Sequence, residues 1–408
     1  MNKNNKLRLV CVGNGMAGMR TLEELLKLAP DLYDITVFGA EPHPNYNRIL
    51  LSPVLAGEQT LQEIVLNDLG WYRRNGIKLH LGNKITAIDR VKRIVHAEDG
   101  SSAKYDRLLL ATGSKPVLLP IPGINLPGVL TYRDIADTQG MIAATAQYKR
   151  AVVIGGGLLG LEAANGLKQR GMDVTVVHLG EWLMERQLDR TAAGLLRRSL
   201  EQKGLEFRLA TQTQELVAGE SGRVAAVKFG DGSSTAADLV VVAVGIRPDI
   251  ELAEKAGLHC SPARPGGIVV SDTMQTHDPR IYAVGECASH RGTTYGLVAP
   301  LFDMATVCAN HLAFHGIGRY TGSQLSTRLK VTGIELFSAG DFQGGDGSED
   351  ITLSDPLRGI YKKLVIRDDR LVGSVLYGDT ADGAYYFDLL REGRKVSDLR
   401  DRLMFGEA

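Results

Sequence analysis

The sequence is poor in cysteine, and no two of its cysteines are close enough in sequence to form a Cys-x-x-Cys pair. The four, Cys11, Cys260, Cys287 and Cys308, include no Cys-x-x-Cys spacing. This argues against a thioredoxin-like dithiol and against a cysteine-ligated zinc or iron–sulfur site. Their scattered positions and mostly apolar neighbours favour a reducing compartment.

An excess of one charge is also missing, because 47 Lys and Arg residues balance 47 Asp and Glu residues. This balance argues against nucleic acid or an anionic membrane as the main partner.

Long apolar runs are absent too. No stretch approaches the length that spans a membrane, and the first residues, "MNKNNKLRLV", lack the apolar core of a secretory signal, so a cytoplasmic protein is expected. Glycine, by contrast, is abundant at 47 residues, beside a hydrophobic content of 44%. These values are typical of an α/β protein with many tight turns. A length of 408 residues suits two or three domains.

A glycine-rich turn near the amino terminus has the spacing of a dinucleotide-binding fingerprint, Gly-x-Gly-x-x-Gly, at Gly13, Gly15 and Gly18. The pattern predicts a strand, a helix and a second strand around it, over residues 7–12, 16–29 and 34–38. In this context the first glycine permits a tight turn, the second lets the backbone approach a pyrophosphate, and the third lets helix and strand pack closely. The helix N-terminus then faces the phosphate charge. Glu41, shortly after the second strand, is the candidate for the ribose hydroxyls.

The same pattern recurs later in the chain, with Gly155, Gly157 and Gly160 at the same spacing. It predicts a strand, a helix and a following strand over residues 150–154, 158–170 and 173–178. One fingerprint alone is weak evidence, but two complete ones are a specific signal. The simplest interpretation is that one site binds FAD and the other a nicotinamide nucleotide.

Three further segments read as buried strands with characteristic ends. "RLLLATGSKP" ends in Ala111-Thr112-Gly113, and "DLVVVAVGIRPD" ends at Gly245. "PRIYAVGECAS" is a strand followed by Glu286 and small residues that are expected to open a helix. Each segment alone is compatible with an ordinary α/β core, but their order along the chain supports the two-site interpretation.

This order of motifs resembles the flavoprotein class with two dinucleotide-binding domains, which includes glutathione reductase and the ferredoxin and rubredoxin reductases. The resemblance covers residues 7–325. It implies an α/β fold of two Rossmann-like domains, with FAD at the first fingerprint and NAD(P)H at the second. The residues it places at FAD are Gly13, Gly15, Met16, Ala17, Gly18, Glu41, Arg48, Ala111, Thr112, Gly113, Gly285, Glu286, Ala299 and Pro300. Those it places at NAD(P)H are Gly155, Gly157, Leu158, Leu159, Gly160, Glu162, His178, Gly245 and Arg247, and Arg133 is a further candidate cofactor contact.

The resemblance also assigns individual roles. Glu286 takes the place of the usual aspartate at the flavin ribityl chain, and its longer side chain is a departure from the class. Arg48 lies in "GAEPHPNYNRILLS", which resembles the FAD-facing segment of dioxygenase-type ferredoxin reductases; a surface ion pair is the alternative. Those reductases usually have a lysine shortly afterwards, where this chain has Pro53. Arg48 and Glu162 are the two catalytic candidates, and Glu162 is expected beside the nicotinamide and flavin. The alternative for Glu162 is an exposed helix carboxylate.

A helix is expected from Ala299-Pro300 onward, since proline suits the first helical position. The resemblance points its N-terminus at the flavin, where the positive end of the helix dipole would stabilise the reduced, anionic ring. Cys287 directly follows Glu286 and is interpreted as a small buried residue. Residues 46–57, "YNRILLSPVLAG", lie where one class of flavin enzymes has redox cysteines, yet contain none. The flavin is therefore expected to pass its electrons directly to an external centre.

A closer resemblance extends over nearly the whole chain. "LLSPVLAGE", "GGGLLGLEAANGL", "LMERQLD", "GECASHRGTTYGLVAP" and the stretch from "YKKLVIRDD" to "YYFDLLR" are similar to the amino-terminal flavin module of assimilatory NAD(P)H nitrite reductases. The FAD electron-transfer subunit of assimilatory nitrate reductase shares this module. The resemblance implies transfer of hydride from NAD(P)H to FAD and of electrons to an iron–sulfur or sirohaem partner. Because no cysteine follows Cys308, the acceptor centres are expected outside this chain.

The choice of nicotinamide nucleotide depends on the strand end at His178. Glu181 follows three residues later, and Arg186 lies further on. An acidic residue near this strand end favours NAD, and an arginine favours the 2′-phosphate of NADP. Glu181 and the lack of an arginine cluster favour NADH, while NADPH stays open. Arg247 is expected to flank this site or to support its loop.

Three domains are expected: an FAD-binding domain of residues 1–116 and 250–322, an NAD(P)H-binding domain of residues 117–249, and a small α+β domain of residues 323–408. In the last, "STRLKVTGIELFSAGDF" alternates as strands do, a hairpin is expected with Asp368 and Asp369 at its turn, and a helix is expected in "ADGAYYFDLLREG". The acidic, glycine-rich residues 340–350 fit no EF-hand spacing and are interpreted as a solvated turn rather than a metal site.

Three functions remain open on the sequence alone. The first is an FAD-dependent NAD(P)H oxidoreductase module for nitrite or nitrate assimilation. The second is a rubredoxin or ferredoxin reductase, or an NADH oxidase-like enzyme, with the same flavin chemistry. The third is a redox-sensing flavoprotein that turns over slowly. The expected partners are NAD(P)H and a redox-protein acceptor, and a homodimer is left open.

Overall fold

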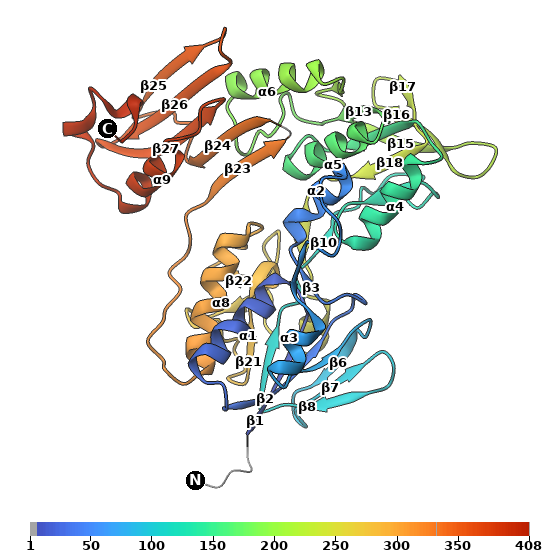
Figure 1. The fold of residues 1–408 in the computed structure, drawn as a ribbon, viewed down its shortest axis with the longest axis vertical. Coiled ribbons are helices and arrows are strands. Elements are labelled where there is room, and N and C mark those ends of the chain that lie inside the picture. The colour runs from blue at the N-terminus through green and yellow to red at the C-terminus, as the bar shows by residue number, and fades with distance from the viewer. Residues whose placement is uncertain (1–5, 332, 408) are drawn as a thin grey trace. The chain divides into compact units, whose positions relative to one another are not determined.

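The structure is a computed structural model that describes residues 6–331 and 333–407. The chain folds into two compact units (Figure 1). The first unit comprises Met1–Leu50, Thr60–Lys115 and Ile246–Ser323. The second comprises Leu51–Gln59, Pro116–Gly245 and Gln324–Ala408. In the described part of the chain no helix is both long and apolar enough to cross a membrane.

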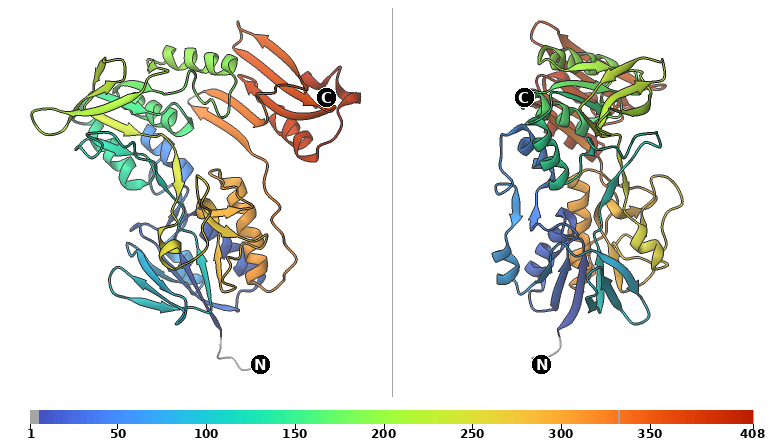
Figure 2. Two further views of the ribbon diagram at one scale, coloured as in Figure 1. Left: turned by 180° about the vertical axis from the view of Figure 1, so that it is seen from behind. Right: turned by 90° about the vertical axis from the view of Figure 1, so that its right-hand side faces the viewer.

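A five-stranded parallel sheet forms the centre of the first unit, in the order β21-β9-β1-β2-β5. Its strands are β1 (Leu7–Val12), β2 (Tyr33–Phe38), β5 (Lys78–His80), β9 (Arg107–Leu110) and β21 (Ile281–Ala283). Apolar side chains on successive positions of β1 and β9 are buried, as expected for a parallel sheet covered on both faces. Helices α1 (Met16–Leu28) and α8 (Val298–Leu312) pack against each other, and Figure 2 shows them side by side in dark blue and orange.

Smaller elements complete the first unit. They are the antiparallel sheet β6 (Ile85–Asp89), β7 (Ile94–Ala97) and β8 (Ser102–Lys104), the pairs β3 (Asn45–Tyr46) with β4 (Val65–Asn67), β10 (Ser114–Pro116) with β19 (Ile246–Pro248) and β20 (Ile268–Val270) with β22 (Ala288–His290), the helices α3 (Leu69–Arg74) and α7 (Glu251–Lys255), and the 3₁₀ turns η1 (Arg48–Leu50) and η2 (Gly285–Cys287).

The second unit repeats this architecture with another parallel sheet, in the order β11-β18-β12-β13-β14. Its strands are β11 (Val129–Thr131), β12 (Arg150–Ile154), β13 (Asp173–Val177), β14 (Glu206–Arg208) and β18 (Leu239–Val242). Its helices are α2 (Leu51–Ala56), α4 (Ile135–Thr145), α5 (Leu158–Gln169) and α6 (Arg190–Gln202), and its antiparallel sheet is β15 (Thr213–Ala218), β16 (Val224–Phe229) and β17 (Ser234–Ala236). In both units the strand that leads into the glycine fingerprint is the central one. The predicted pair of Rossmann-like domains is confirmed.

Helix α2 packs against α4 and α5 of the second unit, although it lies between residues of the first unit in sequence. The contact with α5 is close, because a Cβ built on Gly166 would lie 2.8 Å from Leu55 Cγ. Arg170, just past the end of α5, donates to the carbonyl of Val54 at 3.1 Å and also to that of Leu55. The cysteine-free segment is therefore a helix anchored on the helix of the second fingerprint.

The carboxy-terminal residues form an antiparallel sheet in the order β23-β24-β27-β26-β25, with α9 packed against β24 and β27. Its elements are β23 (Ser326–Val331), β24 (Ile334–Gly340), β25 (Ser348–Asp355), β26 (Ile360–Arg367), β27 (Arg370–Tyr377), α9 (Gly383–Glu392) and the 3₁₀ turns η3 (Ser397–Leu399) and η4 (Leu403–Phe405). The strand character of the first segment, the hairpin and the helix expected in this region are confirmed. Asp368 and Asp369 form the hairpin turn with φ of 49° and 60°, the left-handed conformation that tight hairpin turns require. The three-domain division stays a prediction, since this sheet belongs to the same compact unit as residues 116–245.

Two local expectations were wrong. The residues after Glu286 do not open a helix; they form the short turn η2 and then β22, whose backbone pairs with β20. Pro300 was expected at the first position of its helix. It is instead the third residue of α8, because the helix begins at Val298. Proline is tolerated there because N–H groups in the first turn have no partner within the helix.

Candidate functional site

The first glycine turn lies at the carboxyl end of β1, tightly packed against β9. Gly13 has a φ of +113°, and a Cβ built on it would lie 2.1 Å from the Ala111 oxygen. A Cβ on Gly18 would lie 2.9 Å from Ala111 Cβ. These two positions therefore admit no side chain, as the fingerprint predicts.

The middle glycine of this turn is different. A Cβ built on Gly15 would meet no heavy atom of the described residues within 4 Å, so the backbone here borders open space. Gly15 is also the N-cap of α1 and has no side chain to cap the helix, whose first residues are Met16 and Ala17. Helix N–H groups left in this way bind anions. Both the shape of this turn and its sequence are therefore suited to binding a pyrophosphate.

The second glycine turn has the same geometry at the carboxyl end of β12. Gly155 has a φ of +124°, and its Cβ would lie 2.2 Å from the Ala243 oxygen. A Cβ on Gly160 would lie 2.0 Å from the Gly155 oxygen, whereas one on Gly157 would meet no described heavy atom within 4 Å. Gly157 is the N-cap of α5, which begins with Leu158 and Leu159. The chain therefore has two cradles, each suited to one pyrophosphate.

A hollow of about 160 Å³ lies at the first cradle. Its lining joins the ends of β1, β2 and β9 to the start of α7, through Val12, Gly13, Phe38, Ala40, Lys84, Ile85, Thr86, Thr112, Asp249, Glu251, Leu252 and Lys255. Thr112 donates to the Asp249 carbonyl at 2.7 Å, which ties the end of β9 to the segment after β19. Parallel α/β sheets bind ligands at this edge, outside the carboxyl ends of the strands.

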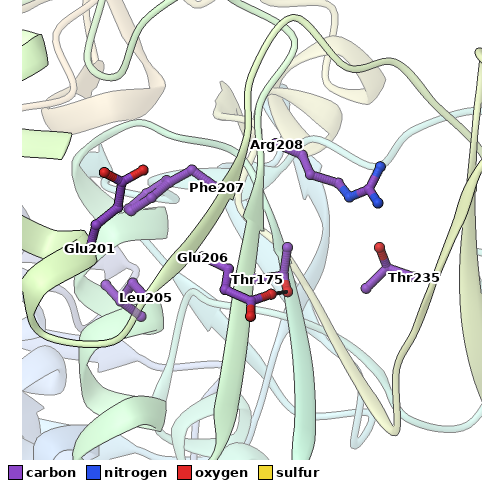
Figure 3. A pocket seen from close by; sticks show the side chains of 7 residues that line it. All are labelled: Thr175, Glu201, Leu205, Glu206, Phe207, Arg208 and Thr235. Carbon is purple, nitrogen blue, oxygen red and sulfur yellow. Dashed lines mark hydrogen bonds between the residues drawn. The ribbon is translucent and has the colours of Figure 1, made fainter. Parts of the chain in front are cut away.

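A second, more open hollow of about 420 Å³ lies elsewhere, on the edge strand β14 of the second unit (Figure 3). It is lined by Thr175, Glu201, Leu205, Glu206, Phe207, Arg208 and Thr235. Glu206 accepts a hydrogen bond from Thr175 at 3.1 Å. None of its lining residues belongs to a fingerprint, so the site is better assigned to the two glycine cradles.

Glu41 and Arg48, expected to lie at FAD, contact each other. Arg48 Nη2 lies 2.6 Å from Glu41 Oε1, and Tyr46 Oη donates to Glu41 Oε2 at 2.7 Å. The Arg48 guanidinium also lies over the Tyr46 ring, 5.1 Å from its centroid. Arg48 therefore forms an ion pair, but a partly buried one and not the surface pair of the alternative interpretation. The pair joins both candidate residues in one cluster.

Glu286 and Gly285 lie in η2, against the start of α1. Ser114 donates to Glu286 Oε2 at 2.7 Å. Gly285 has a φ of +87°, and its Cβ would lie 2.9 Å from Ala17 Cβ, so this turn approaches the first cradle closely. Cys287 is fully buried, as predicted for a packing residue. The structure thus brings η2 and the first glycine turn together.

Helix α8 begins at Val298, so Ala299 and Pro300 lie in its first turn. Its N-cap is Leu297, whose apolar side chain cannot cap the helix. The positive end of the helix dipole is therefore available to a ligand with negative charge.

Glu162 lies on α5, one turn after the second cradle, and is not the exposed carboxylate of the alternative interpretation. Ser52 of α2 donates to its Oε2 at 2.7 Å, and Tyr132 Oη donates to Ser52 Oγ at 3.2 Å. Burial raises the pKa of Glu162, and the Ser52 hydrogen bond opposes this effect. Neither Ser52 nor Tyr132 was among the predicted site residues, because nothing in the sequence connects residue 52 to residue 162.

Arg133 is placed next to Tyr132, and its backbone N–H donates to Asp137 at 2.7 Å.

His178 lies at the end of the strand that follows the second cradle, and both of its ring nitrogens have partners. Gly156 N–H donates to Nδ1 at 3.1 Å, and Nε2 lies 2.7 Å from Glu185. Glu181 forms an ion pair with Arg190. Sequence reasoning missed Glu185 and Arg190, although the run of charges around "GEWLMERQLDR" was a signal.

Two other residues predicted for the second site, Gly245 and Arg247, lie in different units. Gly245 has a φ of +116° and accepts a hydrogen bond from Val117 N–H at 2.9 Å, at the end of the segment after β18. Arg247 is exposed on β19, which belongs to the first unit. Gly245 therefore lies in the same unit as the second cradle, whereas Arg247 lies in the other unit.

Comparison with known proteins supports this assignment. The family model "Pyridine nucleotide-disulphide oxidoreductase" matches residues 7–307, and "Rubredoxin NAD+ reductase C-terminal domain" matches residues 326–394. A nitrite reductase [NAD(P)H] from Bacillus subtilis is 51% identical, over 96% of this chain and 48% of its own length. The assimilatory nitrate reductase electron transfer subunit of the same organism is 46% identical, over 98% of this chain and 51% of its own length. The chain therefore spans about half the length of these relatives.

Solved structures agree with the fold. A ferredoxin reductase from Rhodopseudomonas palustris superposes with a TM-score of 0.86 at 25% identity, over 97% of this chain and 98% of that one. Putidaredoxin reductase, in its covalent complex with putidaredoxin, has a TM-score of 0.86 at 26% identity, over 96% of this chain and 94% of that one. The family and its NAD(P)H-dependent relatives indicate FAD and NAD(P)H as cofactors. With two dinucleotide cradles and a family match over most of its length, the chain belongs to the pyridine nucleotide-disulphide oxidoreductase family.

Proposed function

We propose that this chain is the FAD- and NAD(P)H-binding module that supplies electrons to an iron–sulfur or sirohaem acceptor in assimilatory nitrite or nitrate reduction. In this proposal the FAD-binding domain is formed by residues 1–116 and 250–322, and the NAD(P)H-binding domain by residues 117–249. Residues 323–408 form the third domain. The names of the two Bacillus subtilis relatives motivate the choice of pathway.

The observation that carries the proposal is the absence of a thiol relay. All four cysteines lie in the described part of the chain and are free thiols. Burial raises the pKa of Cys11 to about 12 and that of Cys260 to about 11, so neither forms a reactive thiolate near neutral pH. Helix α2 offers the hydroxyl of Ser52 to Glu162 and carries no cysteine. Electrons would then pass directly from the flavin to a centre outside this chain.

In this proposal the site residues bind and orient the two nucleotides and stabilise charge on them. When bound, FAD accepts a hydride from NAD(P)H and can release electrons one at a time. The Gly15 and Gly157 cradles would hold the pyrophosphates of the two nucleotides. Glu41 and Arg48 would hold the ribose and the flavin, and Glu286 the ribityl chain. The start of α8 would place a positive potential at the reduced ring, and Glu162 would position the nicotinamide.

NADH is the proposed electron donor. Glu181 lies near the strand end where an acidic side chain selects the ribose hydroxyls of NAD. Its partner Arg190 lies over the Trp182 ring, 5.0 Å from the ring centroid, so the arginine is already engaged. A much higher kcat/KM for NADPH than for NADH in steady-state kinetics would contradict this choice.

A stopped-flow experiment tests the proposal. The FAD-loaded protein is reduced anaerobically with NADH and then mixed with one of three acceptors: a [2Fe–2S] domain, rubredoxin or oxygen. Fast reoxidation by the iron–sulfur domain is the expected result. Rubredoxin is included because of the family match over residues 326–394. Preference for rubredoxin would favour a rubredoxin reductase, and preference for oxygen alone would contradict electron transfer to a protein.

A dye-reduction assay addresses the remaining alternative. Rapid, repeated reduction of an artificial acceptor by NADH is expected for an enzyme. A single slow turnover would indicate a redox sensor. The bound cofactor is checked first by its absorption spectrum, because a protein that takes up no FAD would overturn the whole proposal.

A further inference from the structure

Three side chains of the second unit form a directed hydrogen-bond chain that ends on Glu162. Tyr132, between β11 and α4, donates to Ser52 Oγ at 3.2 Å, and Ser52 of α2 donates to Glu162 Oε2 at 2.7 Å. The tyrosine is only 2% exposed. Each donor points the same way, and the chain ends on a carboxylate, which cannot donate when ionised. Hydrogen bonds in such a chain strengthen one another.

The surroundings hold these groups in place. Helix α2 packs on both α4 and α5, and the carbonyl of Val54, two residues after Ser52, accepts a hydrogen bond from Arg170 at 3.1 Å. Ser52 therefore has little freedom to turn away from Glu162. A hydroxyl with a fixed direction is better suited to orienting a carboxylate than a mobile charged side chain is.

Charged groups on the neighbouring elements are engaged elsewhere. Helix α2, with the sequence "LSPVLA", has no ionisable side chain. The strand β18, "LVVV", has none either. The described charged side chains of α4, β12, β13 and β23 have partners away from Glu162: Asp137 with Thr131, Arg150 with Asp238, Asp173 with Lys168, and Arg328 with the ring of Phe337. The balance at Glu162 is therefore between burial, which disfavours the ionised form, and the Ser52 hydrogen bond, which favours it.

We propose that Ser52 and Tyr132 are positioning residues that hold the Glu162 carboxyl in one orientation and keep it ionised near neutral pH. The inference rests on the proposed place of Glu162 at the nicotinamide. Neither Ser52 nor Tyr132 needs to touch the nucleotide. The serine acts directly on the carboxylate, and the tyrosine acts through the serine.

The test titrates Glu162 itself in the FAD-loaded protein, without NAD(P)H. Infrared difference spectra report the protonated carboxyl as a function of pH, and the band is assigned by its loss in Glu162→Gln. In Ser52→Ala the titration is expected to move up by about one pH unit, because burial then acts without its opposing hydrogen bond. In Tyr132→Phe it moves up by less. Ser52→Thr keeps a hydroxyl and is expected to restore the wild-type titration.

Matched controls come from a similar pair elsewhere in the second unit. Ser199 of α6 and Tyr377 of β27 are hydrogen-bonded at 2.6 Å, so Ser199→Ala and Tyr377→Phe remove comparable groups without touching Glu162. They are expected to leave the Glu162 titration unchanged. If they shift it as much as Ser52→Ala does, the effect is a general loosening and the proposal is wrong.

A kinetic measurement adds a second readout. The acidic limb of the pH profile for flavin reduction by NADH should move in the same direction as the infrared titration, with kcat falling more than KM changes. An unchanged titration in Ser52→Ala would overturn the positioning role, and if that variant does not fold, Tyr132→Phe decides. Failure of NADH to reduce the wild-type flavin would instead contradict the proposed function. The infrared titration would still decide whether Ser52 and Tyr132 position Glu162.

Discussion

Arg8 and Asp106 form a two-pronged ion pair at the start of the first parallel sheet. Nε and Nη2 of Arg8 lie 2.9 and 2.7 Å from the two carboxylate oxygens of Asp106, which also accepts from the Arg8 backbone N–H at 2.9 Å. Arg150 and Asp238 repeat this arrangement in the second unit, at 3.2 and 2.6 Å for the side-chain contacts. In each unit the pair joins the fingerprint strand to the residue just before the neighbouring strand, β9 or β18. The duplication therefore extends beyond the glycines.

The first prediction concerns stability and pH. The hydrogen bond from Arg8 lowers the pKa of Asp106 to about 2. Because the folded pKa lies below the unfolded one, the pair stabilises the fold above about pH 4 and loses this effect as the pH falls towards 2. Asp106→Asn should lower the free energy of unfolding at pH 7 by about 1 kcal/mol, a value reduced for the solvent-exposed guanidinium. Urea titrations at several pH values measure this effect.

A control for this prediction is Asp31→Asn, which removes the partner of Lys6 at an aspartate side chain that is 93% exposed. Such a pair is expected to contribute less than about 0.5 kcal/mol. A loss in Asp106→Asn that is as large at pH 2 as at pH 7 would contradict the ion-pair explanation.

The second prediction separates the glycines of each cradle. Gly15→Ala should leave the melting temperature of the apoprotein within about 2 °C, because the new Cβ meets no described atom within 4 Å. It should nevertheless weaken FAD binding at least about tenfold, a cost of about 1.4 kcal/mol, since the methyl group takes space needed by the pyrophosphate. Gly157→Ala should keep FAD and raise the KM for NADH. Thermal denaturation and FAD titration are the measurements.

Gly13→Ala is the contrasting variant. Its φ of +113° and the 2.1 Å approach to the Ala111 oxygen predict a loss of about 2 kcal/mol or more in stability, before any ligand is added. If Gly13→Ala is as stable as wild type, or if Gly15→Ala binds FAD normally, the geometry assigned to the cradle is wrong.

The third prediction concerns thiols. Cys11, Cys287 and Cys308 are fully buried, and burial raises the pKa of each. A thiol reagent at pH 8 is therefore expected to react slowly with the native protein and to leave NADH-dependent dye reduction intact. In guanidinium chloride all four cysteines should react. Cys260→Ser removes the partly exposed thiol and serves as the control. Rapid inactivation that persists in Cys260→Ser would point to a thiol in the electron path.

The fourth prediction concerns the nicotinamide nucleotide. Glu181→Gln removes the charge that pairs with Arg190, so the guanidinium becomes available to a 2′-phosphate. The ratio of kcat/KM for NADPH to that for NADH should rise by roughly 3- to 10-fold. Glu201→Gln on α6, which frees Arg197 of a comparable exposed pair, should not change the ratio. A ratio that stays constant in both variants would place the ribose away from Glu181.

The fingerprints and the carboxy-terminal hairpin were predictable because their requirements are local. A positive φ at Gly13 or Gly155, and a left-handed turn at Asp368 and Asp369, constrain only a few neighbouring residues. The helix α9 likewise ends where Gly393 adopts φ +59°, a stop that glycine signals in the sequence itself. Hydrophobic periodicity then sets the type of each long element.

Local signals were insufficient where long-range pairing decides the backbone. The small residues after Glu286 would suit a helix, yet Ala288–His290 form β22 because β20 offers them backbone partners. Propensity is a weak prior that tertiary context overrides.

By itself, the sequence determined the two glycine fingerprints and the absence of a Cys-x-x-Cys motif, since both follow from residue types at fixed spacings. The tertiary structure alone decided that α2 packs on α5 and that Ser52 reaches Glu162, 110 positions along the chain. It also decided that Arg190 pairs with Glu181 and Arg8 with Asp106. These contacts depend on which apolar faces are buried against each other, and burial is a property of the whole packed chain, not of any short segment.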